Sequence, residues 1–233
     1  MTQPPPPRSP LALGALALVV GLAAATAACE AEPADVLDTP RILALRADPA
    51  TLSPGAEHAV TALAFAVTGE LRWSLCPVAW APTDPLSCPT GDAVDLGTGN
   101  PLVATLPADL DDLWLRCEDV SGVALPAVKR LTTADDTVNP DVVAFTTPAG
   151  SLPASVARAT SVDLSPTLTG ADPDRVVVSW YVTAGVLEPK RSVGAAAVTF
   201  TAPDEPGPVT LLAVARDKGG GVGWLEATIE VDP

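Results

Sequence analysis

Proline and glycine divide this chain into short segments along almost its whole length. The 233 residues include 26 prolines and 17 glycines, which are spread through the chain and not gathered in one tract. Proline removes a backbone N–H donor and clashes inside a helix, so long helices cannot form across this spacing. The runs between these residues are rich in Val, Ala, Leu and Thr. Short apolar runs between turn residues are typical of strands, so the sequence predicts an all-β protein.

The N-terminus is the exception. Residues 11–28, LALGALALVVGLAAATAA, carry neither charge nor proline, and Arg8 is the only cationic side chain before them. A charged start, an apolar run and small residues ahead of a cut are the three parts of a secretory signal. We therefore expect residues 1–28 to form a signal helix that is removed by cleavage. The run also approaches the length of a membrane-spanning helix, so an uncleaved anchor is the alternative.

The end of this run carries a family signature. The sequence Thr26-Ala27-Ala28-Cys29 resembles the lipobox of bacterial lipoproteins, from which it departs at Thr26, where the family usually has leucine. The resemblance implies that the thiol of Cys29 is acylated and that the bond before it is cut. More than one acyl chain makes membrane anchoring stable. An incidental thiol in a spanning helix is the alternative.

The lipobox resemblance also implies a location. Residues 29–40 would form a short acidic tether after the lipid. The residue after the cysteine is Glu30 and not aspartate, which in this family favours the outer membrane over retention at the inner one. We therefore expect a lipid-anchored protein of the bacterial cell envelope, with the membrane as its first partner.

The rest of the chain falls into two similar halves. Residues 41–55, RILALRADPATLSPG, have a counterpart in residues 141–155, DVVAFTTPAGSLPAS. Each half also has a tryptophan, Trp73 or Trp180, inside an alternating run that is typical of a strand with one buried face. This recurrence predicts two domains of one architecture. We place the first at 41–138, with a long loop, and the second at 139–233.

The second half has the clearer strand pattern. Val176, Val178, Trp180 and Val182 fall on one face of a strand, and further short apolar runs follow at regular spacing. Such spacing is the signature of an antiparallel sandwich. The runs VSWYVTAGVL, VTFTAP and GPVTLLAVARD resemble bacterial immunoglobulin-like and PKD-like domains over residues 140–232. The resemblance implies an immunoglobulin-like β-sandwich with a core tryptophan for this half, and the recurrence of the pattern predicts a second such sandwich in the first half. It departs at Val209, where a tyrosine corner would need tyrosine.

The first half is less regular. Residues 77–100 form a long proline-rich loop, and the stretch after it has two interpretations. Leu113, Trp114 and Cys117 repeat at helical spacing, whereas residues 113–117 also alternate like a strand. We expect a short helical insertion here, with Asp109 as its N-cap.

The cysteines predict one disulfide. With Cys29 assigned to lipid, Cys76, Cys88 and Cys117 remain, in an exported protein whose surroundings preserve disulfides. Cys76 and Cys88 bracket part of the proline-rich loop and are the local pair, while Cys76 with Cys117 is the alternative. The leftover cysteine is either a buried, inert thiol or a site for intermolecular pairing. We expect Cys117 to be buried, because a free cysteine packs like a small hydrophobe.

No pattern of catalytic or metal-binding residues stands out. His58 is the only histidine, and we expect it on the surface near a turn, so a zinc site or a His-activated nucleophile is not predicted. There is no G-x-S-x-G and no phosphate-binding loop, and KGGGVG at residues 218–223 reads as a hairpin turn. The carboxylates at residues 109–112 and 172–174 are expected to cap and solvate turns, although a carboxylate pair is the remaining catalytic alternative. We predict no enzyme activity, no metal and no cofactor.

Charge excludes another class of function. The chain has 13 basic against 28 acidic residues and a net charge of −15. No basic stripe is available to neutralise phosphates, so nucleic-acid binding is not expected.

Two tryptophans are the candidate binding aromatics. Trp80 lies in the proline-rich loop, and Trp224 lies on the strand face opposite Leu225 and Ala227. An exposed tryptophan can stack on a sugar or anchor a protein partner, whereas a half-covered one would fill a loop or an interdomain seam. The sequence therefore predicts an envelope-anchored, non-catalytic binding or scaffold module with a protein or glycan partner. A carbohydrate-binding or adhesion module is the alternative.

Overall fold

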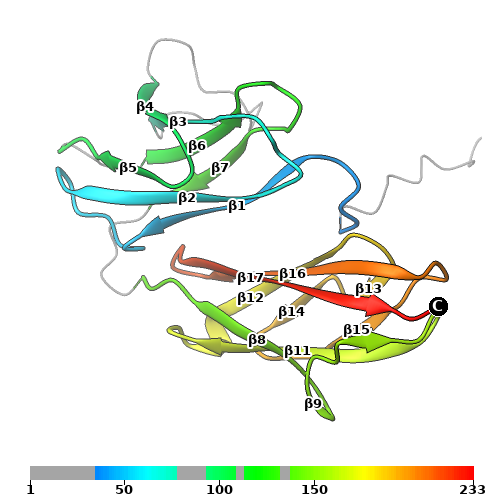
Figure 1. The fold of residues 1–233 in the computed structure, drawn as a ribbon. Coiled ribbons are helices and arrows are strands. Elements are labelled where there is room, and N and C mark those ends of the chain that lie inside the picture. The colour runs from blue at the N-terminus through cyan, green and yellow to red at the C-terminus, as the bar shows by residue number, and fades with distance from the viewer. Residues whose placement is uncertain (1–34, 78–92, 109–112, 132–136) are drawn as a thin grey trace, which may run out of the picture. The chain divides into compact units, whose positions relative to one another are not determined.

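The computed structural model describes residues 35–77, 93–108, 113–131 and 137–233, and these are largely β-strand (Figure 1). Within these ranges the only helical element is the single 3-10 turn η1 (Pro173–Arg175). The prediction of an all-β protein is therefore confirmed. The expected signal helix lies outside the described residues. In the described part of the chain, no helix has the length and apolar character needed to cross a membrane.

The first half of the chain forms two antiparallel sheets. One sheet has the order β1-β2-β5, and the other has the order β4-β3-β6-β7. The strands are β1 (Arg41–Asp48), β2 (Glu57–Phe65), β3 (Leu71–Pro77), β4 (Val94–Thr98), β5 (Leu102–Thr105), β6 (Leu113–Asp119) and β7 (Ala127–Arg130). Side chains from both sheets share one core, as in a β-sandwich.

Trp73 of β3 lies at the centre of this first core. Its side chain is fully buried beside Leu45 of β1 and Leu115 of β6. A buried indole N–H needs an acceptor, and Nε1 donates to the carbonyl oxygen of Gly99 at 2.7 Å. The alternating pattern around Trp73 thus correctly predicted a core tryptophan.

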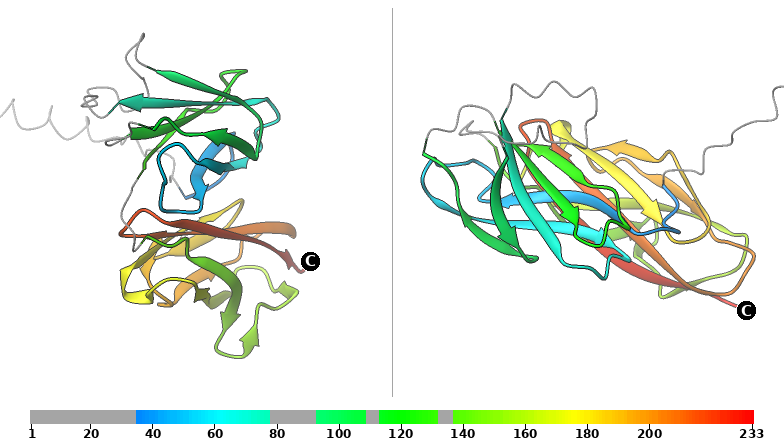
Figure 2. Two further views of the ribbon diagram at one scale, coloured as in Figure 1. Left: turned by 90° about the vertical axis from the view of Figure 1, so that its left-hand side faces the viewer. Right: turned by 90° about the horizontal axis from the view of Figure 1, so that it is seen from above.

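The second half forms two five-stranded sheets (Figure 2). Their orders are β13-β15-β11-β8-β9 and β10-β17-β16-β12-β14. The strands are β8 (Asp141–Thr147), β9 (Gly150–Ser151), β10 (Ser155–Val156), β11 (Ser161–Thr169), β12 (Val176–Val182), β13 (Val186–Glu188), β14 (Arg191–Val193), β15 (Val198–Thr201), β16 (Gly207–Asp217) and β17 (Val222–Val231). The short strand β10 pairs parallel to β17, and the other pairs between strands of this half are antiparallel.

Trp180 of β12 has the same role in the second core. It is 1 % exposed, its Nε1 donates to Ser192 Oγ at 3.1 Å, and its ring centroid lies 5.2 Å from that of Phe145. Val176 and Val178 on the same face are fully buried with it. The face assignment made from the sequence is confirmed.

The helical prediction for residues 113–117 is wrong. This stretch belongs to strand β6, which pairs antiparallel with β3 and brings Cys117 opposite Trp73. Leu115 and Cys117 point into the first core, and Trp114 lies half-buried on the other face. The stretch forms a strand because β3 provides hydrogen-bond partners for its backbone, and because every second side chain is buried in the core. The expected cap at Asp109 lies outside the described residues.

The prediction of a surface histidine is also wrong. His58 is 2 % exposed and alternates with the buried Val60 and Ala62 on β2. Its Nε2 accepts a hydrogen bond from the backbone N–H of Ser53 at 3.2 Å. The ring therefore closes the turn before β2 and takes an inward position of the strand.

Candidate functional site

Strand β16 is buried on both of its faces. Leu211, Ala213 and Ala215 belong to the core of the second sandwich. Leu212 and Val214 point the other way and join a separate apolar cluster with Leu37, Ala44, Leu63 and Val222. We call this cluster the seam, because it unites residues of β1 and β2 with residues of β16 and β17. Residues 34–233 accordingly form one compact unit.

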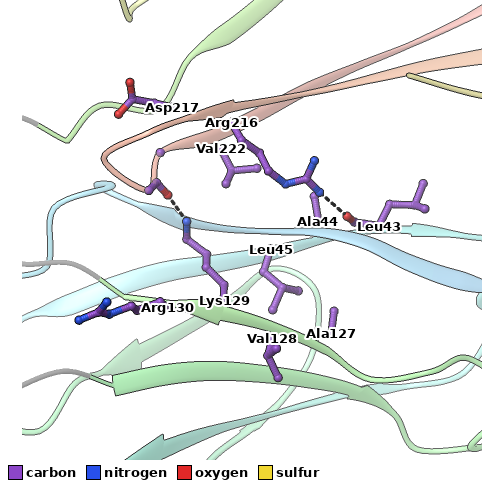
Figure 3. A pocket seen from close by; sticks show the side chains of 12 residues that line it. Leu43, Ala44, Leu45, Ala127, Val128, Lys129, Arg130, Arg216, Asp217 and Val222 are labelled. Carbon is purple, nitrogen blue, oxygen red and sulfur yellow. Dashed lines mark hydrogen bonds between the residues drawn. The ribbon is translucent and has the colours of Figure 1, made fainter. Parts of the chain in front are cut away.

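Two cationic side chains add hydrogen bonds across the seam (Figure 3). Arg216 of β16 donates from Nη2 to the carbonyl oxygen of Leu43 on β1 at 2.8 Å. Lys129 of β7 donates from Nζ to the carbonyl oxygen of Gly220 in the β16–β17 turn. Each of these bonds joins a residue of one sandwich to a residue of the other.

The segment that links the sandwiches contributes a third connection. Asn139 donates from Nδ2 to the carbonyl oxygen of Ala47 at 2.8 Å, and its Oδ1 accepts from the backbone N–H of Val222 at 2.9 Å. One amide side chain thus ties β1 to the beginning of β17. The Asn139 amide thus provides hydrogen-bond partners for the Ala47 carbonyl oxygen and the Val222 N–H at the seam.

Glycine lets this linking segment lie directly on β17. A Cβ on Gly221 would sit 1.7 Å from the carbonyl oxygen of Val138, and one on Gly223 would sit 1.8 Å from that of Pro140. No side chain fits at these distances. The predicted hairpin turn at 218–223 is present, and its glycines also provide room for close backbone packing.

The N-terminal end of the described chain docks on the second sandwich. Leu37 N–H donates to the carbonyl oxygen of Val182 at 2.7 Å, and Val182 N–H donates to that of Asp35 at 2.9 Å. The buried Asp35 carboxylate lies 2.5 Å from Lys190 Nζ. Residues 35–37 lie within the predicted tether, 29–40, and these hydrogen bonds hold them against strand β12.

A pocket of about 310 Å³ opens at the seam. Its lining comes from β1, β7, β16, the β16–β17 turn and the first residue of β17: Leu43, Ala44, Leu45, Ala127, Val128, Lys129, Arg130, Arg216, Asp217, Gly220, Gly221 and Val222. Most of these residues are apolar or glycine, and the charged ones are Lys129, Arg130, Arg216 and Asp217. We call it the seam pocket.

Burial changes the acidity of the lysine in this pocket. Withdrawal from water, with the nearby positive charge of Arg216 as the smaller cause, lowers the pKa of Lys129 to about 8. Both effects disfavour the charged ammonium. The seam pocket therefore holds a lysine that titrates within the mildly alkaline range.

The predicted site residues are placed as follows. Cys29, Trp80 and Cys88 lie outside the described residues, so the lipidation site and the Cys76–Cys88 bridge stay predictions. Cys76 is buried in β3 and is not a free thiol. Cys117 is buried and free, so its alternative pairing with Cys76 is wrong, and burial raises its pKa to about 12.

Trp224 is not an open platform. Its indole is half-buried against the seam, together with Tyr181 and Phe65. The sequence correctly placed it on the face opposite Leu225 and Ala227, which pack on the second core.

The described carboxylates organise turns. Asp172 caps η1 by accepting from Asp174 N–H at 3.0 Å, as predicted. Asp119 accepts from Ser121 Oγ at 2.6 Å and from the backbone N–H groups of Ser121, Val123 and Ala124, and these bonds lower its pKa, the Ser121 hydroxyl foremost. Within the described ranges, no three His, Cys, Asp or Glu side chains are grouped so as to hold a metal ion.

The strand topology defines a protein with tandem immunoglobulin-like β-sandwiches. No family model and no curated protein matches the chain. Solved structures that match the chain include fibronectin(III)-like modules of Clostridium thermocellum CbhA, at 12% identity and a TM-score of 0.30, covering 81% of this chain and 93% of that one. Yersinia pseudotuberculosis adhesin InvE matches at 14% identity and a TM-score of 0.29, over 82% of this chain and 58% of that one. A glycoside hydrolase family 2 β-glucuronidase matches at 13% identity and a TM-score of 0.26, over 82% of this chain and 20% of that one.

Proposed function

We propose that this protein is a non-catalytic binding or scaffold module, anchored by lipid on Cys29 to the bacterial cell envelope, at the outer membrane. The contacts across the seam are the observation that supports a binding or scaffold module. Arg216, Lys129 and Asn139 each bond across it, and an apolar cluster fills it, so the two sandwiches act as one unit. A unit of this kind can hold a bound partner in a defined orientation.

The docked N-terminal segment supports the anchored arrangement. Six peptide units separate Cys29 from Asp35, the first described residue, which is buried and paired with Lys190. An extended chain of that length spans at most about 20 Å. Acylation of Cys29 would therefore keep the second sandwich close to the membrane surface.

Mass spectrometry of the membrane fraction tests the anchor. We expect an N-terminal peptide that begins with acylated Cys29, and an intact peptide that spans Ala28 and Cys29 would contradict the proposal. The matched control is Cys29→Ala, from which we expect no acylated N-terminal peptide. Folding of this variant is checked by the burial of Cys117, which should stay protected from alkylation.

The module itself is tested by cross-linking in intact cells. We expect specific cross-links between the anchored protein and an envelope protein or glycan, and we expect the Cys29→Ala variant to lose them. A carbohydrate-binding or adhesion role is the alternative, and it now depends on Trp80, because Trp224 lies against the seam. Glycan binding that Trp80→Ala abolishes would favour that alternative.

A further inference from the structure

Lys129 and Arg216 differ from the other cations of the described chain because they are half-buried and no described carboxylate pairs with them. Six basic side chains pair with Asp or Glu: Arg41, Arg46, Arg72, Arg116, Arg175 and Lys190. Arg130, Arg158, Arg191 and Lys218 are exposed to solvent. Lys129 and Arg216 are half-buried, and within the described residues no salt bridge reaches either of them.

Two neighbouring positive charges in a partly dry pocket repel each other and lose hydration. The one carboxylate that lines the seam pocket, that of Asp217, does not neutralise them. It lies 3.4 Å from Arg175 Nε and accepts from Gly219 N–H at 2.6 Å, and Figure 3 shows it directed away from both cations. In a chain of net charge −15, Lys129 and Arg216 form a local concentration of positive charge that no described carboxylate neutralises.

Both cations keep donors for a ligand. Arg216 donates to Leu43 O at 2.8 Å and to Ser179 Oγ at 3.3 Å, and a guanidinium has about five N–H donors. Lys129 donates to Gly220 O, and an ammonium has about three. An anion placed between them would receive charge-assisted hydrogen bonds, which are stronger than neutral ones.

The remaining walls decide the kind of anion. Leu43, Leu45, Val128 and Val222 give the pocket an apolar side, and its volume of about 310 Å³ is at the small end for a ligand site. Inorganic phosphate would leave this apolar surface unused. We propose that the seam pocket binds a small organic carboxylate with a compact hydrocarbon body, whose anionic group is held by Lys129 and Arg216.

This inference rests on the proposed function, because it names a ligand class for the binding module. The two proposals can be tested separately. Mass spectrometry of the Cys29 peptide tests the lipid anchor, and a direct binding measurement tests the ligand. Isothermal titration calorimetry of the full chain in non-ionic detergent tests the site with 3-methylbutanoate. The matched probes are the neutral amide of the same acid and inorganic phosphate.

We expect the carboxylate to bind, and to bind more tightly than either matched probe. Lys129→Met should weaken it by about tenfold or more, since the variant removes one partner of a charge pair. Arg191→Met removes an exposed charge of the same sign and should leave binding unchanged. Equal binding of acid and amide, equal binding of phosphate, or no loss in Lys129→Met would overturn the proposal.

A second measurement needs no variant. The chain has three lysines, Lys129, Lys190 and Lys218, so NMR of isotope-labelled lysine side chains resolves each of them. Titration with 3-methylbutanoate should shift the Lys129 signal and leave the Lys218 signal in place. A shift at Lys218 alone, or at none of the three, would contradict the site even if Lys129→Met did not fold.

Discussion

The guanidinium of Arg216 donates a 2.8 Å hydrogen bond to the backbone carbonyl oxygen of Leu43, a residue 173 positions earlier in the chain. The bond joins the outer face of a strand in the second sandwich to β1 of the first. The carbonyl lies where the register between β1 and β2 shifts, between Ile42 and Ala44, and Arg216 provides it with a charged donor. Arg216 thus links the stability of the seam to the charge of the pocket beside it.

Arg216→Met should therefore destabilise the whole unit. The change removes the charged donor from the Leu43 carbonyl oxygen, and loss of a hydrogen bond from a charged group costs about 1.5–3 kcal/mol. Urea denaturation followed by tryptophan fluorescence measures the free energy of unfolding. Arg191→Met, at an exposed position, should change it by less than about 0.5 kcal/mol. Equal stability of the two variants would show that the Arg216 bond contributes nothing.

Gly223→Ala tests the close approach of the linking segment to β17. A Cβ at this position would lie 1.8 Å from the carbonyl oxygen of Pro140, so the linker must move away. Overpacking of this kind costs about 1–3 kcal/mol. Thr228→Ala, at an exposed position in the same strand, is the control and should be nearly neutral. The free energy of unfolding, again from urea titration, separates the two.

Cys117 should resist alkylation in the folded protein. Burial raises its pKa to about 12, so at neutral pH the reactive thiolate is scarce, and the side chain is not accessible. Iodoacetamide should label it only after unfolding in guanidinium, as peptide mass spectrometry would report. Cys117→Ala identifies the signal. Labelling of native protein at the rate of a free cysteine would contradict the placement of Cys117 in the first core.

The predictable part of this fold is the part that local pattern controls. Trp73 and Trp180 stand in alternating runs, and the alternation alone places both in cores, because a strand with one buried face has a period of two. The proline and glycine residues between short apolar runs correctly predicted an all-β protein. At residues 113–117 two periods fit the sequence equally well, and only the pairing with β3 decides between them.

The seam pocket could not be predicted in this way. Lys129 and Arg216 are 87 residues apart in the printed sequence, and nothing near either of them indicates a shared pocket. One signal was available: residues 211–215, LLAVA, are apolar at every position, which suits a strand covered on both faces. That run indicates a second contact surface on β16 but does not name what covers it. The prediction of a surface position for His58 was wrong for a related reason. The inward position of its ring depends on a hydrogen bond with Ser53 in the preceding turn, which the residue pattern does not indicate.

Lys129 should make stability depend on pH in the alkaline range. Its pKa is about 8 in the folded protein and near the ordinary value of 10.5 when unfolded. Between these values the unfolded chain binds the proton and the folded one does not, so stability from this group rises as pH increases from about 8 to 10.5. Below pH 8 the charged ammonium is present in both states, and its burial is a constant penalty.

The comparison with Lys129→Met isolates this effect, because titration of Cys117 and other groups is common to both proteins. Arg216, Arg130 and Asp217 are the other charged groups that line the pocket, and they are the same in both proteins. The melting temperature of the native chain minus that of Lys129→Met should therefore increase from pH 8 to pH 10. A difference that stays constant, or that falls with pH, would show that Lys129 keeps an ordinary pKa and that the pocket is more hydrated than its geometry indicates.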